Sequence, residues 1–125
     1  MTANILTVDD SASMRLLLSA TLSAAGYQVA EAGDGVEALE YASRHQADLA
    51  LLDVNMPRMD GITLVKNLRA LEGYRLTPLL MLTTEAGADL KAQAKQAGAT
   101  GWIVKPFNPA QLLATLAKVL GTKAP

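Results

Sequence analysis

Cysteine is absent from this chain of 125 residues, and histidine occurs only once, at His45. The lack of cysteine excludes disulfide frameworks, thiol nucleophiles and cysteine-based zinc sites. A single histidine leaves no histidine cluster for a metal ion or a catalytic triad. Any reactive chemistry must therefore come from carboxylates, hydroxyls and lysines.

Long apolar runs and a strong charge of either sign are also missing. No run approaches the roughly 18 apolar residues of a membrane span, and the first residues lack the pattern of a signal peptide. The net charge is −1 and no basic stripe occurs, which argues against DNA as a primary partner. We expect a cytoplasmic protein that is not inserted into a membrane.

What the chain does contain is enough apolar sequence for one core. Half of its residues are hydrophobic, and 125 residues correspond to about one domain. Neither a linker nor a low-complexity segment interrupts the pattern. We expect residues 1–125 to form a single domain without an output domain.

Five short apolar runs alternate with five segments of helical periodicity. The apolar runs predict strands at 5–8, 27–32, 49–52, 78–82 and 102–104. Helices are expected from the cap candidates Ser11 or Ser13 to Gly26, and from Asn108 to Gly121. Further helices are expected at 36–45, 62–71 and 88–97.

This alternation is typical of an α/β fold in which helices cover both faces of a parallel sheet. The first, third and fourth runs are apolar throughout, which indicates strands that are buried on both sides. Right-handed crossovers limit the possible topologies. We expect a doubly wound, five-stranded parallel sheet with strand order 2-1-3-4-5 and five helices.

Polar residues follow the carboxyl ends of four predicted strands. Asp9 and Asp10 follow the first strand and Asp53 follows the third. Thr83 follows the fourth strand and Lys105 follows the fifth. Each residue alone is most simply a helix cap or a solvated side chain. Together they predict three carboxylates, a hydroxyl and an ammonium at the edge where open α/β sheets bind ligands.

Such a group of side chains suits phosphoryl chemistry. Crowded carboxylates need compensating cations, and one lysine leaves an excess of about two negative charges. An oxygen-only donor set suits Mg²⁺, and a carboxylate can accept a phosphoryl group covalently. Asp53 is the favoured acceptor because it ends the middle strand. Asp9 and Asp10 share one turn and are better placed to hold the metal.

Several short motifs occur in an order and at a spacing that are similar to a known family. They are VDDS at 8–11, LDVNMP at 52–57, MDG at 59–61, MLTTE at 81–85 and KPF at 105–107. Over essentially its whole length the chain resembles the receiver domain of two-component response regulators, and most of all the single-domain chemotaxis regulators. Their fold is flavodoxin-like, with the strand order that flavodoxin and CheY share.

The resemblance implies roles for the acidic residues. Asp53 would accept a phosphoryl group from a phosphohistidine on a sensor histidine kinase. Asp10 and Asp53 would ligate Mg²⁺ through their side chains. Asp9 would act on the metal mainly through water, and Asn55 would contribute its backbone carbonyl.

The resemblance also implies a switch. Thr83 would hydrogen-bond a phosphoryl oxygen, and Lys105 would pair with the phosphate or with Asp53, often before a cis bond to Pro106. Trp102 stands where the family usually has Tyr or Phe, and it would turn inward when Thr83 moves. That movement would remodel a surface of the last two helices and the last strand, which binds partners.

Asn55 and Glu85 occupy positions that tune dephosphorylation in the family. The resemblance therefore implies a signalling switch with slow autodephosphorylation rather than an enzyme. It implies a monomer with a downstream protein target, such as a flagellar motor switch, and with a possible phosphatase. Two alternatives remain open: a Mg²⁺-dependent phosphohydrolase acting on small substrates, and a phosphate sink without a dedicated output.

Other notable residues are expected to be structural. His45 closes a helix, where it would interact with the helix dipole. Tyr74 and Arg75 are expected at the surface, and Met56 and Met59 are expected to fill loop and core space.

Overall fold

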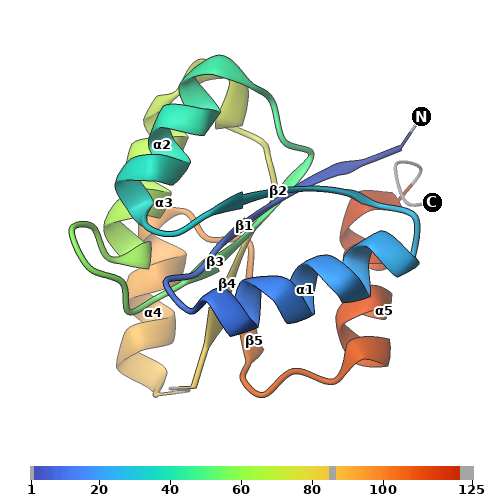
Figure 1. Ribbon diagram of the computed structural model, residues 1–125. Coiled ribbons are helices and arrows are strands. Elements are labelled where there is room, and N and C mark those ends of the chain that lie inside the picture. Colours follow the sequence, from blue (N-terminus) through green and yellow to red (C-terminus); the bar gives the residue numbers. More distant parts are fainter. Residues whose placement is uncertain (1, 85–86, 122–125) are drawn as a thin grey trace.

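A parallel sheet forms the centre of the chain in the computed structural model, which describes residues 2–84 and 87–121 (Figure 1). Its strands pair in the order β2-β1-β3-β4-β5, so the predicted order is confirmed. The strands are β1 (Asn4–Val8), β2 (Gln28–Ala32), β3 (Leu49–Asp53), β4 (Leu79–Thr83) and β5 (Gly101–Val104).

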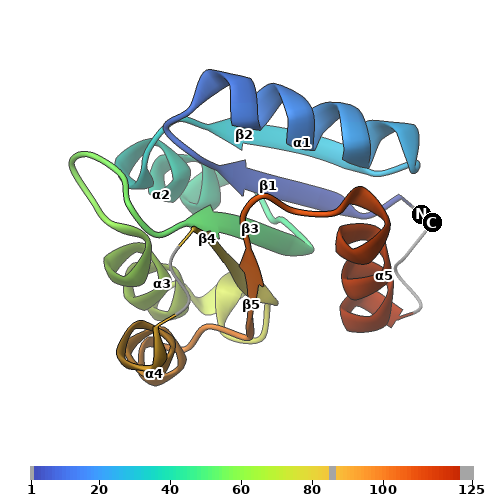
Figure 2. The same cartoon turned by 90° about the horizontal axis from the view of Figure 1, so that it is seen from below.

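Helices cover both faces of this sheet. Figure 2 shows α1 and α5 on one face and α2, α3 and α4 on the other. The helices are α1 (Ala12–Ala24), α2 (Gly35–Arg44), α3 (Gly61–Ala70), α4 (Ala88–Ala97) and α5 (Pro109–Leu120), with a short 3₁₀ turn η1 (Glu72–Tyr74). None of them, within the described residues, has the length and apolarity that crossing a membrane requires.

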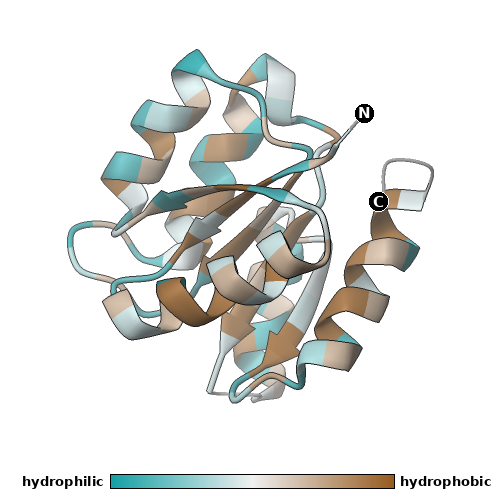
Figure 3. Cartoon of the chain, turned by 45° about the vertical axis from the view of Figure 1, so that its right-hand side comes forward, coloured by the Kyte–Doolittle hydropathy of each residue, from teal (hydrophilic) through white to brown (hydrophobic). Residues whose placement is uncertain are grey.

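The core consists of two apolar layers, one on each face of the sheet (Figure 3). Leu6, Leu52 and Leu64 belong to the layer under α2–α4, whereas Leu18 and Leu116 belong to the layer under α1 and α5. Every residue of β3 and β4 is buried, as their unbroken apolar sequences predict. Truncation of one such leucine to alanine typically costs about 2–5 kcal/mol, so this packing holds the strand ends in place.

Helix caps explain where several helices begin. Ser11 Oγ accepts a hydrogen bond from the Met14 N–H at 3.3 Å, and Asn108 Oδ1 accepts one from the Gln111 N–H at 3.1 Å. The predictions of Ser11 and Asn108 as caps are therefore confirmed. Ser13 is not a cap, because it lies inside α1.

The prediction that Tyr74 lies at the surface is wrong, whereas Arg75 is exposed as expected. Tyr74 is 1% exposed. Its hydroxyl donates to the His45 carbonyl at 2.6 Å and accepts from the Ala47 N–H at 2.9 Å. The turn η1 directs this ring inward, where its hydroxyl finds both hydrogen bonds that a buried phenol requires.

Candidate functional site

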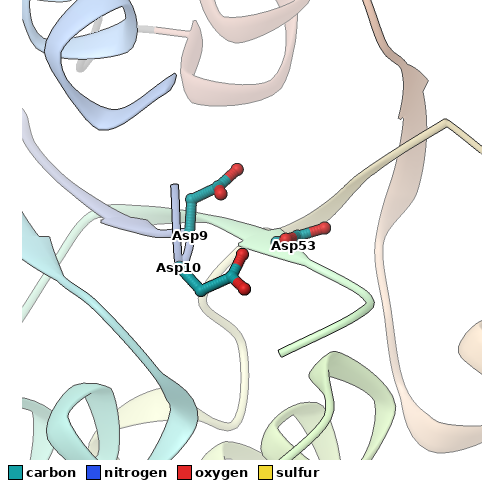
Figure 4. Close-up of side chains that lie close together, drawn as sticks. All are labelled: Asp9, Asp10 and Asp53. Atoms are coloured by element: carbon teal, nitrogen blue, oxygen red, sulfur yellow. The ribbon is translucent and has the colours of Figure 1, made fainter. Parts of the chain in front are cut away.

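Two neighbouring strands bring three carboxylates together. Asp9 and Asp10 follow β1, and Asp53 is the last residue of β3, which pairs with β1. One oxygen atom from each carboxylate lies within 4.8 Å of the others, and Figure 4 shows the three side chains directed toward a common space. The predicted clustering of Asp9, Asp10 and Asp53 at one edge of the sheet is thus observed.

Lys105 contributes the positive charge of this cluster. It follows β5, and its N–H donates to the Thr83 carbonyl at 2.7 Å, which ties it to the end of β4. Its Nζ lies 2.8 Å from Asp9 Oδ2 and 3.3 Å from Asp53 Oδ1. The lysine therefore bridges two carboxylates and lies nearer to Asp9 than to Asp53. The bond between Lys105 and Pro106 is cis.

Burial distinguishes the three acids. Asp9 and Asp53 are 1% and 7% exposed, whereas Asp10 is open to solvent. Asp9 is also fixed by its surroundings, because Oδ1 accepts from the Ser11 N–H at 2.9 Å and its carbonyl accepts from Arg15 Nη1. Asp9 is thus an anchored buried charge, and Asp10 is the accessible one.

The electrostatics favour a proton or a further cation near Asp53. Burial, together with the charge of Asp9, raises the pKa of the Asp53 carboxyl, although Lys105 and the Asn55 N–H oppose this rise. Burial acts to lower the pKa of Lys105, but its contacts with Asp9 and Asp53 outweigh burial and the pKa is raised. Lys105 therefore stays charged at neutral pH while the carboxylates repel each other.

Gly61 sets the position of the helix that follows the site. Its N–H donates to the Val54 carbonyl at 2.8 Å. A Cβ atom added at Gly61 would lie 2.1 Å from the carbonyl oxygen of Asp53, a distance no real side chain tolerates. The backbone of α3 therefore begins directly against Asp53. The intervening loop (residues 54–60) must start at Asp53 and bring the chain back to the same place at Gly61. The exposed Asn55 lies in this loop.

The comparisons with known proteins agree with this geometry. A model of the response regulator receiver domain matches residues 5–117. The chain is 44% identical over 120 residues to the chemotaxis protein CheY1 of Helicobacter pylori, which covers 94% of this chain and 97% of that protein. The structure of the chemotaxis protein CheY4 of Vibrio cholerae shares 50% identity at a TM-score of 0.93, over 95% of this chain and 99% of that one.

The chain belongs to the response regulator receiver domain family. It is therefore a phospho-accepting response regulator, and receiver domains of this type are signalling switches. The phosphohydrolase alternative is not favoured by these relatives.

The donor set of this receiver domain fits Mg²⁺. The acidic cluster offers only oxygen ligands, and against three carboxylates it has one lysine, which leaves two negative charges. A receiver domain from a sensor histidine kinase of Pseudomonas aeruginosa, PA1611, has a magnesium ion coordinated in its active site cleft. That structure is 31% identical at a TM-score of 0.90, over 97% of this chain and 99% of that one.

Thr83 and Trp102 of the receiver domain lie on the adjacent strands β4 and β5. Thr83 ends β4 and is 1% exposed, and Trp102 pairs with Met81 across β4 and β5. Because side chains alternate along a strand, Thr83 and Met81 face the same side of the sheet. Trp102 is half-buried against the layer under α2–α4, and its buried Nε1 has no hydrogen-bond partner among the described residues. Glu85 lies outside the described residues.

Proposed function

We propose that Asp53 is the phosphoryl acceptor of this receiver domain and that a sensor histidine kinase is the donor. The observation that carries the proposal is the position of Asp53. It is a largely buried carboxylate at the end of a central strand, beside two acids and Lys105. In the transfer, an Asp53 carboxylate oxygen forms a bond to phosphorus while the phosphorus–nitrogen bond of the phosphohistidine breaks. The electron pair of that bond stays on the imidazole.

Four residues of the chain are suited to hold Mg²⁺ at this place. Asp10 and Asp53 would bind through their side chains, Asp9 mainly through water and Asn55 through its carbonyl. The bound metal would neutralise charge on the phosphoryl oxygens during transfer. The exposure of Asp10 leaves this side of the cluster accessible.

Lys105 and Thr83 would receive the phosphoryl group once it is attached. Phosphorylation adds about 1.5–2 negative charges and three acceptor oxygens at Asp53. Lys105 already lies 3.3 Å from this carboxylate, so it can pair with the new oxygens. The Thr83 hydroxyl would donate a hydrogen bond to one of them.

The movement of Thr83 would reach the surface through Trp102. Trp102 borders a cavity of about 340 Å³ between β5 and α5, whose lining also includes Phe107 and Gln111. A shift of the indole toward Thr83 would change the shape of the surface formed by α4, β5 and α5. We propose this surface as the output of a single receiver domain, residues 1–125, which acts as a monomer.

We further propose that the domain works in chemotaxis signalling in the cytoplasm. Support comes from the relatives named chemotaxis proteins, which match nearly the whole chain. The downstream target would be a protein such as the flagellar motor switch. Asn55 and Glu85 would tune the loss of the phosphoryl group, alone or with a phosphatase.

A labelling experiment tests the acceptor. With Mg²⁺ and a small acyl phosphate as donor, the wild-type protein should gain one acid-labile phosphate, and Asp53→Asn should gain none. Asp60→Asn is the matched control, because Asp60 is an exposed acid near the site that caps α3. Equal labelling of Asp53→Asn and wild type would contradict the proposal, and continuous turnover of a small phosphoester would favour a phosphohydrolase.

A further inference from the structure

The loop from Asp53 to α3 contains a strained turn centred on Arg58. Arg58 has φ 66°, which among the described residues is the only positive value outside glycine. The Met59 N–H donates to the Pro57 carbonyl at 2.7 Å across Arg58. An i→i+2 hydrogen bond around a residue with positive φ is the rare and strained form of γ-turn. Such strain persists only where surrounding contacts hold it.

Asp34 provides the contact that holds this turn. Arg58 donates to Asp34 Oδ2 from Nε at 2.9 Å and from Nη2 at 2.5 Å. Asp34 is itself fixed, because its Oδ1 accepts from the Glu37 N–H at 2.8 Å and so caps α2. The hydrogen bond from Glu37, followed by that from Arg58, lowers the pKa of Asp34, so the pair is charged at neutral pH.

Packing brings the same loop against the start of α2. A Cβ atom added at Gly35 would lie 2.8 Å from Met59 Cβ and 3.0 Å from the Met59 carbonyl oxygen. The loop is therefore restrained at two places. Gly61 holds its end against Asp53, and the pair of Arg58 with Asp34 holds its tip against α2.

Asn55 lies in the chain between the end of β3 and the restrained tip of the loop, two residues after Asp53 and three before Arg58. The path of the loop determines where the Asn55 carbonyl lies relative to the acidic cluster. Without the Arg58 contact the strained turn would be free to relax, and the backbone between Asn55 and Arg58 would be less restrained.

We propose that Arg58 is a positioning residue that acts through Asp34 to hold the Asn55 carbonyl in place for Mg²⁺. The inference rests on the proposed function, since it assigns Asn55 to the metal. It adds a residue that does not touch the metal, and it makes the start of α2 part of the metal site. Arg58 is 60% exposed, and exposed ion pairs contribute little to global stability, so the effect is expected to be local.

Variants of Arg58 and Asp34 can remove the ion pair between them while the backbone conformation of the loop and the cap of α2 remain possible. Arg58→Asn removes the guanidinium, and asparagine tolerates positive φ, so the turn stays accessible. Asp34→Asn removes the charge but keeps an oxygen that can cap α2. Arg44→Ala is the control, because it removes another exposed arginine that pairs with Glu40 at the far end of α2.

The first measurement is a calorimetric titration with Mg²⁺ alone. We expect each of Arg58→Asn and Asp34→Asn to weaken Mg²⁺ binding by about threefold, as befits one exposed ion pair. The double variant should be no weaker than either single variant, and Arg44→Ala should bind like wild type. Wild-type affinity in both single variants, or additive losses in the double variant, would overturn the proposal.

The second measurement needs no metal. Amide hydrogen exchange of the Mg²⁺-free protein should become faster at Met59 in Arg58→Asn, while protection in β1 and β3 stays unchanged. Unchanged exchange at Met59 would overturn the proposal. Phosphate labelling of Asp53→Asn is independent of both measurements. A failure of Asp53 as the acceptor is therefore distinguishable from a failure of Arg58 as a positioning residue.

Discussion

Buried polar side chains lie at both ends of the sheet, but the two ends differ in whether these side chains find compensating partners within the protein. At the amino ends of the strands, Tyr74 and Arg69 find hydrogen-bond partners among nearby backbone groups. At the carboxyl ends, Asp9, Asp10 and Asp53 share one compensating lysine.

At the amino end, the buried polar side chains are hydrogen-bonded to groups of the protein itself. Tyr74 uses its hydroxyl as both donor and acceptor. Arg69 donates to the carbonyls of Gly98, Tyr74 and Thr77 at 2.7–3.0 Å, which joins α3 to the turns before β4 and β5. These contacts hold parts of the fold together without a bound ion or ligand.

The acidic cluster at the carboxyl end has two more carboxylates than lysines. A structure selected only for stability would not place like charges together, because their repulsion and their burial both act against folding. The difference between the two ends thus separates residues that maintain the fold from residues that we propose to bind a ligand. Substitutions at the two ends should therefore differ in how the change in unfolding free energy depends on pH and on Mg²⁺.

The largest effect is expected for Lys105→Met. This change leaves the buried carboxylates of Asp9 and Asp53 without their cation and should cost about 3 kcal/mol of unfolding free energy at pH 7 without Mg²⁺. The loss should shrink in acid, where Asp53 takes up a proton. Urea denaturation at pH 7 and pH 5 measures it, with the exposed Lys118→Met as control. Equal stability of Lys105→Met and wild type would refute the contrast.

Tyr74→Phe should have the next largest effect. It leaves the Ala47 N–H and the His45 carbonyl without their shared partner, which should cost about 2 kcal/mol. Unlike the Lys105 variant, its loss should not change with Mg²⁺ or with mild acid. Tyr41→Phe is the matched control, because the half-buried Tyr41 hydroxyl accepts from Asn4 Nδ2. Similar losses in both tyrosine variants would contradict the prediction.

Asp53→Asn should have the smallest effect and the opposite sign. Because the pKa of Asp53 is raised on folding, its stabilising contribution is present below the ordinary carboxyl pKa and is lost as the pH rises through the raised value. The variant should therefore be slightly more stable than wild type at pH 7, by on the order of 1 kcal/mol or less. Thermal unfolding across pH 4–8 without Mg²⁺ provides the measurement, and a less stable variant at pH 7 would be inconsistent with repulsion at this site.

Much of the fold could be predicted from the sequence because strand burial has a simple pattern. The unbroken apolar runs at β3 and β4 indicated central strands, and the acids that end β1 and β3 then had to meet. The clustering of Asp9, Asp10, Asp53 and Lys105 follows from topology alone. Their roles in phosphoryl transfer remain predictions.

What could not be predicted depends on contacts distant in sequence. Tyr74 follows Glu72 and Gly73, a polar context that indicates a surface, and its partner His45 lies 29 residues away. The pairing of Arg58 with Asp34 spans 24 residues and carries no motif. The nearer approach of Lys105 to Asp9 than to Asp53 depends on side-chain geometry, which no pattern in the sequence reveals.

The missing side chain at Gly61 limits how the domain can respond to modification. Because the first turn of α3 lies against the carbonyl of Asp53, the backbone of Asp53 cannot move in that direction. Any displacement caused by a new group on Asp53 would therefore have to be absorbed by parts of the molecule other than the first turn of α3. One hydrogen atom in place of a methyl group thus excludes one of the directions in which the backbone of Asp53 could move.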